Sequence, residues 1–361
     1  MTRWLLERAT RRFGRLAAVL AAAALVAGTC ACGSRTAAHP VRVDNRWRVT
    51  TPAAAGMSAA TLARAERLVR TRFRNVVAVL VVRHGRIAFE RYYGPYGRTI
   101  PLDLFGITAS VTSVALGLAI ADGSISGVDE TLGRLFPIEL RDVLDARARH
   151  VTLRRLLTMT AGFPRDPLDP FARPPFSIDA RPLVALLSRP LSPGPRRFVY
   201  DSGSAQLVAD AVARAEEMPM ATFVRARLFR PLGIRDDSSW PVDAGAFTWG
   251  YTGLRLTARD LAKIGYLYLR RGRWHGRRIL PASWVRESTA AHVRLPGGLG
   301  YGYFWWRVPV GGVDGFAALG AGGQLLLVVP RRDLVAVVAQ AGIVNVADPA
   351  PIARLLVAAA R

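Results

Sequence analysis

The sequence predicts an α/β protein of the α+β type, in which one antiparallel sheet is flanked by helices and carries an inserted all-helical subdomain. Strand patterns occur toward both ends of the chain, at residues 76–93 and 301–340. The middle of the chain shows helical patterns separated by long loops. Strands on both sides of a helical middle imply a single sheet that is closed by the C-terminal segment.

The first elements follow from local patterns. Residues 58–70 place apolar side chains at helical spacing after Ser58, a residue type that caps helices. Two strands are predicted at 76–82 and 86–93, and His84-Gly85 between them is typical of a hairpin turn. We therefore interpret His84 as a turn residue rather than a catalytic one.

The later elements alternate in the same way. Residues 107–122 are rich in small and apolar residues and predict a buried helix. Further helices are predicted at 152–159, 204–216, 257–271 and 350–360. Strands are predicted at 301–308, 315–319, 324–329 and 334–340.

One large domain is predicted after an N-terminal export signal. Removing 31 residues from 361 leaves 330, which is ample for a single core, and no internal repeat divides them. We predict a signal peptide at 1–31, a tether at 32–57, a main domain at 58–345 and a C-terminal helix that packs on the sheet at 346–361. The sheet half of the main domain covers 58–97 and 298–345, and its helical half covers 98–297.

The first 31 residues have the layout of a lipoprotein signal peptide. Arginines at positions 3, 8, 11, 12 and 15 precede an apolar run from Leu16 to Thr29, which is too short to span a bilayer comfortably. A small residue then precedes Cys32, so we predict that Cys32 carries a lipid that anchors the exported protein at the outer face of the cell membrane. Nearby cleavage without a lipid is the alternative, and Thr10-Arg11-Arg12 leaves twin-arginine export open.

Composition limits the partners of the protein. The formal net charge is +24, and loss of the signal peptide with its five arginines and Glu7 leaves about +20. Because an exported protein does not meet nucleic acid, we expect a membrane surface or an anionic envelope polymer as its neighbour. The alternative is that 49 arginines beside the single Lys263 reflect codon usage. Neither the cysteines nor the histidines have metal-ligand spacing, so we predict no metal and no cofactor.

Seven segments between about residues 55 and 345 resemble one enzyme superfamily. They are Leu80 through Gly85, Thr108 through Gly123, Leu153 through Gly162, Phe198 through Gly203, Pro231 through Ile234, Leu256 through Gly265 and Gly300 through Tyr303. Together they resemble the serine β-lactamase, penicillin-binding protein and esterase superfamily, particularly the class C-like branch that contains 6-aminohexanoate-dimer hydrolases. The resemblance implies a β-lactamase/transpeptidase-like fold.

The catalytic motif of that superfamily is missing here. Its nucleophile opens a buried helix as Ser-x-x-Lys, and the lysine takes the serine proton or keeps the pair reactive. Aligned on Ser110 through Ser113, the four motif positions become Gly106-Ile107-Thr108-Ala109. Gly106 marks a vacant nucleophile position and Ala109 a vacant lysine position. No shift in register restores the motif or a Lys-Thr-Gly strand motif, because the chain has one lysine, Lys263, with no serine three residues before it.

The resemblance places two further motifs at the pocket. Tyr200-Asp201-Ser202 falls where relatives have Tyr-x-Asn or Tyr-x-Ser, whose tyrosine acts as general base or proton relay. A tyrosine with an ordinary pKa of about 10 needs a nearby cation to act as phenolate, so we interpret Tyr200 as a neutral wall of the pocket. Gly320 through Gln324 either lets a ligand approach strand N–H groups or only makes a tight start to a strand. The predicted pocket residues are Ser202, Ser110, Gly322, Gly323 and Gln324.

Backbone groups at the pocket do not depend on the lost side chains. The oxyanion hole of the superfamily consists of N–H groups at the nucleophile position and on the glycine-rich strand, so the N–H of Gly106 could still receive a carbonyl or carboxylate. Ser110 lies on the same helix face one turn deeper, but it has no base beside it and is not expected to replace the nucleophile.

Three functional hypotheses follow. The leading one is an exported, lipid-anchored protein that is catalytically inactive and binds a peptide, acyl or β-lactam-like ligand or a cell-envelope partner. The second is an amide or ester hydrolase that uses Tyr200 in a non-standard mechanism. The third is a basic cell-envelope scaffold without a meaningful pocket. The sequence does not decide between an enzyme and a binding protein, but it excludes catalysis by a Ser-x-x-Lys motif.

Overall fold

The structure is a computed structural model, and it describes residues 47–163, 182–194, 197–234, 240, 242, 247–342 and 348–360. The predicted signal peptide, the predicted lipidation site Cys32 and most of the predicted tether lie outside these residues. Among the helices that the structure describes, none combines the length and the apolar character that crossing a membrane requires.

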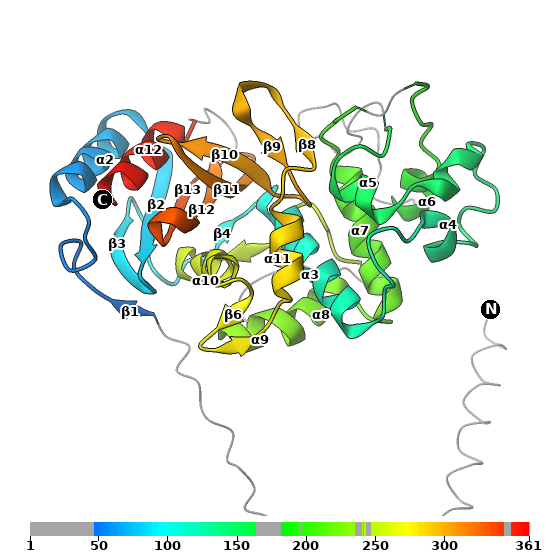
Figure 1. Cartoon of the computed structure of the whole chain (residues 1–361), viewed down its shortest axis with the longest axis horizontal. Helices are drawn as coiled ribbons and strands as arrows, with labels where there is room; N and C mark the ends of the chain where they lie inside the picture. Colours follow the sequence, from blue (N-terminus) through cyan, green and yellow to red (C-terminus); the bar gives the residue numbers. More distant parts are fainter. Residues whose placement is uncertain are drawn as a thin grey trace, which may run out of the picture. The chain divides into compact units, whose positions relative to one another are not determined.

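One sheet forms the centre of the fold (Figure 1). In the described residues it has nine strands, in the order β1-β3-β2-β13-β12-β11-β10-β9-β8, and only β1 and β3 pair in parallel. The strands from the early and the late part of the chain join where β13 pairs with β2. This pairing confirms the predicted α+β class with one antiparallel sheet. The strands are β1 (Arg48–Val49), β2 (Val76–Arg83), β3 (Arg86–Tyr92), β8 (Val293–Arg294), β9 (Gly300–Tyr301), β10 (Trp306–Val310), β11 (Val313–Gly320), β12 (Gln324–Val329) and β13 (Leu334–Gln340).

Helices cover both faces of the sheet. On one face α2 (Ala59–Arg72) packs beside α12 (Ala350–Ala359), while α10 (Ala258–Leu269) packs against β2, β12 and β13 on the other (Figure 1). The central strands are therefore buried on both sides, which explains why their sequences are nearly continuous apolar runs rather than alternating ones. Two apolar clusters result, one on each face.

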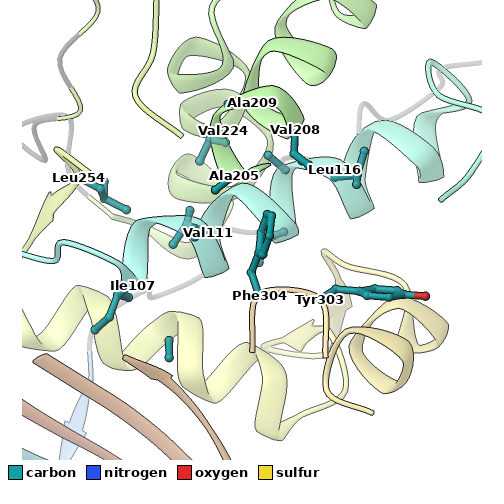
Figure 2. Close-up of a cluster of buried hydrophobic side chains, with 14 of the residues drawn as sticks. Ile107, Val111, Leu116, Ala205, Val208, Ala209, Val224, Leu254, Tyr303 and Phe304 are labelled. Atoms are coloured by element: carbon teal, nitrogen blue, oxygen red, sulfur yellow. The ribbon is translucent and has the colours of Figure 1, made fainter. Parts of the chain in front are cut away.

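The helical half of the molecule is built around α3 (Ile107–Asp122), which begins at the residue where the sequence predicts a buried helix. Figure 2 shows α3 crossing α7 (Ser202–Ala215), with small and apolar side chains of the two helices in contact. The smaller helices of this half are α4 (Leu132–Leu135), α5 (Leu153–Leu157), α6 (Pro182–Leu187), α8 (Met220–Val224), α9 (Arg230–Leu232) and α11 (Ala282–Ser288). It also contains the short strand pairs β4 (Leu102–Asp103) with β5 (Arg255–Leu256), and β6 (Arg273–Trp274) with β7 (Arg277–Arg278).

The predicted strand at 301–308 is wrong. The chain forms β9 and β10 separately, with a turn at 302–305 between them. Phe304 in this turn has φ +61°, and its N–H donates to the carbonyl of Leu157. The apolar and aromatic pattern is typical of a strand, but these side chains are buried because the turn inserts toward the helical half.

Part of the predicted tether belongs to the folded domain. Within the predicted range 32–57, residues 48–49 form β1, and the indole N–H of Trp47 donates to the carbonyl of Arg259 at 2.9 Å. The Trp47 ring also packs edge-on against Tyr266 and Trp274. The folded domain therefore starts at or before Trp47, about ten residues earlier than the sequence predicts.

Candidate binding site at the start of α3

The site is centred on Gly106, which precedes the first residue of α3. The residue before it, Phe105, has φ +45°, a strained value for a residue with a side chain. This turn directs the N–H groups of Ile107 and Thr108 to the carbonyls of Leu104 and Phe105. The N–H of Gly106, by contrast, has no acceptor within the described part of the chain.

The surroundings of Gly106 leave little room for a side chain. A Cβ atom at residue 106 would lie 2.8 Å from the carbonyl oxygen of Leu319 and 3.0 Å from the hydroxyl of Tyr200. Contacts with Cβ under 3.0 Å require a shift, and here the nearest atom belongs to the backbone of β11. The structure thus brings together Gly106, Tyr200 and the end of β11, three segments far apart in the sequence.

Gly320 completes this contact; it belongs to the predicted glycine-rich segment but was not among the predicted pocket residues. A Cβ on Gly320 would lie 2.3 Å from the carbonyl oxygen of Leu104 and 3.3 Å from the nitrogen of Gly106. The strand end can approach the start of α3 only because residue 320 lacks a side chain. The signal was present in the sequence, since Gly320 is the first glycine of the glycine-rich segment.

The last residues of β11 have an open side. Their strand partners are in β12, where Leu319 pairs with Leu325 and Gly320 with Gln324. On the other side β10 begins at Trp306, which pairs with Ala317, so no described residue of β10 pairs with residues 318–320. Gly106 and Tyr200 lie at this part of the strand.

The predicted lysine position is occupied by Ala109, whose side chain is buried. The only lysine of the sequence, Lys263, lies in α10 and is 6% exposed. Its ammonium donates to the carbonyl of Gly233 at 2.7 Å and pairs with Asp260 at 2.8 Å. These two partners hold the only lysine in a structural role between α9 and α10.

Ser110 belongs to the packing of the core rather than to the site. Its hydroxyl is buried and donates to the carbonyl of Phe304 at 2.6 Å. Figure 2 shows Phe304 beneath α3, on the side of α3 away from α7. The hydroxyl of Ser110, predicted as a pocket residue, thus holds the turn between β9 and β10.

Tyr200 is the exposed aromatic side chain of the site. It is 37% exposed, and its ring lies nearly parallel to that of Trp306, with centroids 6.4 Å apart and an angle of 17°. Trp306 in turn contacts Tyr301 and Phe198 edge-on, at 4.9 and 6.0 Å. Burial raises the pKa of Tyr301 well above its ordinary value, so Tyr301 stays neutral and serves as apolar support.

A buried ion pair holds the residue that follows Tyr200. Asp201 caps α7, is 2% exposed and accepts two hydrogen bonds from Arg189, at 2.6 and 3.2 Å. Asp201 also accepts from the N–H and hydroxyl of Ser204. The Arg189 guanidinium lies 3.6 Å from the centre of the Phe163 ring. The predicted pocket residue Ser202 is buried in the first turn of α7, directly after this cap.

The remaining predicted pocket residues form the turn between β11 and β12. Gly322 and Gly323 have φ values of +83° and +78°, which only glycine adopts without strain. Gln324 is the first residue of β12. It is buried, and its amide nitrogen donates to the carbonyl of Gln340 at 2.7 Å while its amide oxygen accepts from the N–H of Gln340 at 3.2 Å. Gly322 and Gly323 allow the hairpin turn, and the two hydrogen bonds of Gln324 connect the hairpin to β13.

Comparison with known proteins agrees with the fold. The chain matches the Beta-lactamase family over residues 63–360. It is 29% identical over 157 residues to 6-aminohexanoate-dimer hydrolase of Paenarthrobacter ureafaciens, a match that covers 40% of this chain and 39% of that protein.

Solved structures with the same fold are more distant in sequence. A putative 6-aminohexanoate-dimer hydrolase from Bacillus anthracis superposes with a TM-score of 0.70 at 21% identity, covering 82% of this chain and 81% of that one. A D-stereospecific amidohydrolase from a Streptomyces species gives 0.65 at 19% identity, covering 82% and 98%. The family match spans most of this chain, including Gly106, Tyr200 and the end of β11, and the protein belongs to the β-lactamase family of hydrolase-related proteins.

Proposed function

We propose that this protein is a non-catalytic member of its family, which binds a peptide, acyl or β-lactam-like ligand at the start of α3 without covalent chemistry. One observation carries the proposal. Residue 106 has no side chain to attack a carbonyl, and the space of that side chain is bordered by the Leu319 carbonyl and the Tyr200 hydroxyl. Without a nucleophilic side chain at residue 106, the protein cannot form an acyl-enzyme there. The close packing around Gly106 therefore supports non-covalent binding.

The position of the lysine supports the same proposal. The sole lysine of the sequence is buried in its own ion pair with Asp260. Nucleophile and base act as a unit, and removal of such a unit leaves a residual acceleration of only about 10³ to 10⁴ over water. Family members that turn over substrate by the Ser-Lys route therefore offer no direct guide to the activity of this chain.

Backbone groups give the site something to bind. The N–H of Gly106 has no acceptor within the described residues, and β11 has an open side at residues 318–320. A ligand carbonyl or carboxylate can accept from an N–H group at this position. The strained backbone at Phe105 is consistent with a retained function, since strain persists at binding and catalytic sites.

A reversible-binding experiment tests the proposal. We expect isothermal titration calorimetry to detect benzylpenicillin or an N-acetyl dipeptide binding to the purified protein, and intact-mass spectrometry to show no covalent adduct. Tyr200→Phe should weaken binding, whereas Tyr93→Phe should not, because Tyr93 packs in the apolar cluster on the α2 and α12 face. A stable penicilloyl adduct would contradict the proposal.

A second candidate is a hydrolase in which water attacks directly and Tyr200 relays the proton. The observation in its favour is that the hydroxyl of Tyr200 lies 3.0 Å from the place where the Cβ atom of a side chain at residue 106 would be. This candidate requires turnover of an ester or amide that disappears in Tyr200→Phe.

We also propose that the protein is exported and anchored by a lipid on Cys32. The apolar run before Cys32 and the arginines preceding it support this. In cells, Cys32→Ala should move the protein from the membrane fraction to the soluble fraction and abolish incorporation of labelled palmitate. Unchanged membrane association without label would contradict the lipid anchor.

A further inference from the structure

We propose that an aromatic ledge beside Gly106 binds the ring of an aryl carboxylic acid or of its amide. The aromatic ledge consists of Phe198, Tyr200, Tyr301 and Trp306. The inference rests on the proposed binding function and names the chemical class of its ligand.

One side chain of the ledge is exposed, and the others are held by contacts with each other. Tyr200 is 37% exposed, and Trp306 and Phe198 are half-buried, whereas Tyr301 is 1% exposed. Trp306 is held edge-on by Tyr301 and Phe198, whose own ring centroids are 5.0 Å apart. Because these edge-to-face contacts fix Trp306, the ledge can bind a flat group without first ordering its own side chains.

The ledge is continuous with the proposed carbonyl site. The hydroxyl end of Tyr200 lies 3.0 Å from the position of a Cβ on Gly106, and its ring lies against Trp306. A ligand whose carbonyl or carboxylate meets the N–H of Gly106 therefore has its neighbouring atoms beside the Tyr200 ring. We infer that a ring close to the carboxylate is the group that lies on the ledge.

Charge selects an anionic ligand over a cationic one. The formal net charge, +24 for the full chain and about +20 without the predicted signal peptide, repels cations and attracts anions. The carboxylate next to the ledge, Asp201, is already neutralised by Arg189 and is not available to a cationic ligand. Aromatic faces alone would also suit a cation, so the argument for an aryl carboxylate rests on the positive net charge of the chain.

Two matched acids test the proposal. Phenylacetate and cyclohexylacetate carry the same carboxylate and differ in the ring, so their dissociation constants, measured by calorimetry on the purified protein, isolate the aromatic contribution. We expect phenylacetate to bind about threefold to tenfold more tightly, the range typical of an aromatic pair. Trp306→Leu should remove this preference. Trp249→Leu should keep it, because Trp249 is half-buried with its own aromatic partners, Phe247 and Tyr251.

The outcomes separate the two proposals. Equal affinity of the native protein for both acids, with measurable binding, overturns the aromatic ledge and leaves the binding function standing. No binding of either acid or of benzylpenicillin overturns both. If Trp306→Leu does not fold, Trp306→Phe provides the comparison: it should reduce but not abolish the preference, and an unchanged preference in that variant overturns the role of Trp306.

Discussion

Gly106 is the residue at which two physical effects oppose each other. Its backbone is helical, with φ −59° and ψ −16°, so alanine should favour this conformation over glycine by up to about 1 kcal/mol. The added Cβ would meet the backbone carbonyl of Leu319 at 2.8 Å, however. Steric overlap with a strand of the central sheet outweighs helix propensity at this position.

We therefore predict that Gly106→Ala lowers the free energy of unfolding by about 1–3 kcal/mol, the range of overpacking substitutions. Chemical denaturation followed by circular dichroism measures this change. Gly97→Ala is the matched control, because a Cβ at residue 97 meets no atom within 4 Å, and it should be neutral or slightly stabilising. A Gly106→Ala variant as stable as the control would show that the site has room for a side chain.

Single residues show what sequence reasoning could and could not find at the site. Gly106 and Tyr200 could be named from the sequence because they lie at fixed offsets from recognisable segments, and the structure brings them close together. The hydrogen bonds of Lys263 and Gln324 could not be predicted, because their partners, the carbonyls of Gly233 and Gln340, come from other parts of the chain. A sequence pattern gives the type of a polar residue, but its burial depends on which distant backbone group it meets.

At the scale of elements, the segment of residues 198–201 depends on the ion pair between Arg189 and Asp201. Both side chains are largely buried, so removing one leaves a buried charge without its partner. We predict that Arg189→Met destabilises the protein by about 3–5 kcal/mol, as measured by urea denaturation. Arg134→Met should cost less than about 1 kcal/mol, because the Arg134–Glu130 pair is mostly exposed on the arginine side. Similar losses in the two variants would contradict the role of the buried pair.

Helix α7 contains a carboxyl group that makes stability depend on pH. Burial raises the pKa of Asp210 to about 7, although the amide of Gln206 and the charge of Arg214 act in the opposite direction. One carboxylate oxygen of Asp210 is buried without a partner in the described residues. In the unfolded chain the pKa of an aspartate is about 4. The folded state thus binds the proton more tightly, and stability falls as pH rises from about 4 to about 7.

Asp210→Asn should remove this dependence. We expect the variant to have a higher melting temperature than the native protein at pH 8, with the difference shrinking toward pH 4, where the native carboxyl is protonated in both states. The exposed Asp314 provides the control, and Asp314→Asn should show no such trend. A gain in Asp210→Asn that is equal at both pH values would contradict the assignment to the buried carboxyl.

At the scale of the whole molecule, the sheet could be predicted because strands near both ends of the chain have the apolar patterns of buried strands. The pairing of β13 with β2 joins them. The break between β9 and β10 could not be predicted, since the aromatic run at 303–306 fits a strand equally well. Only contact with the helical half, through the bonds of Phe304 to Leu157 and Ser110, makes this run a turn.

The fold also explains how family membership and the proposed lack of catalysis coexist. The elements around the site, α3, α7 and β11, form as in a β-lactamase-like protein because their packing depends on apolar and small residues. In the Ser-Lys hydrolases that the sequence resembles, catalysis depends on two side chains at the start of this helix, and we infer that Gly106 and Ala109 replace them here without disturbing the packing. A shared fold therefore establishes the site but not its activity.

The most direct test is turnover of nitrocefin and of a short-chain p-nitrophenyl ester by the purified protein, measured beside Tyr200→Phe. We predict that the native protein hydrolyses these substrates no faster than buffer, or with only the residual acceleration of a site that lacks nucleophile and base. We expect the same rate for Tyr200→Phe. Saturable turnover by the native protein that disappears in Tyr200→Phe would contradict it and would make the protein an enzyme that uses its tyrosine in place of the Ser-Lys pair.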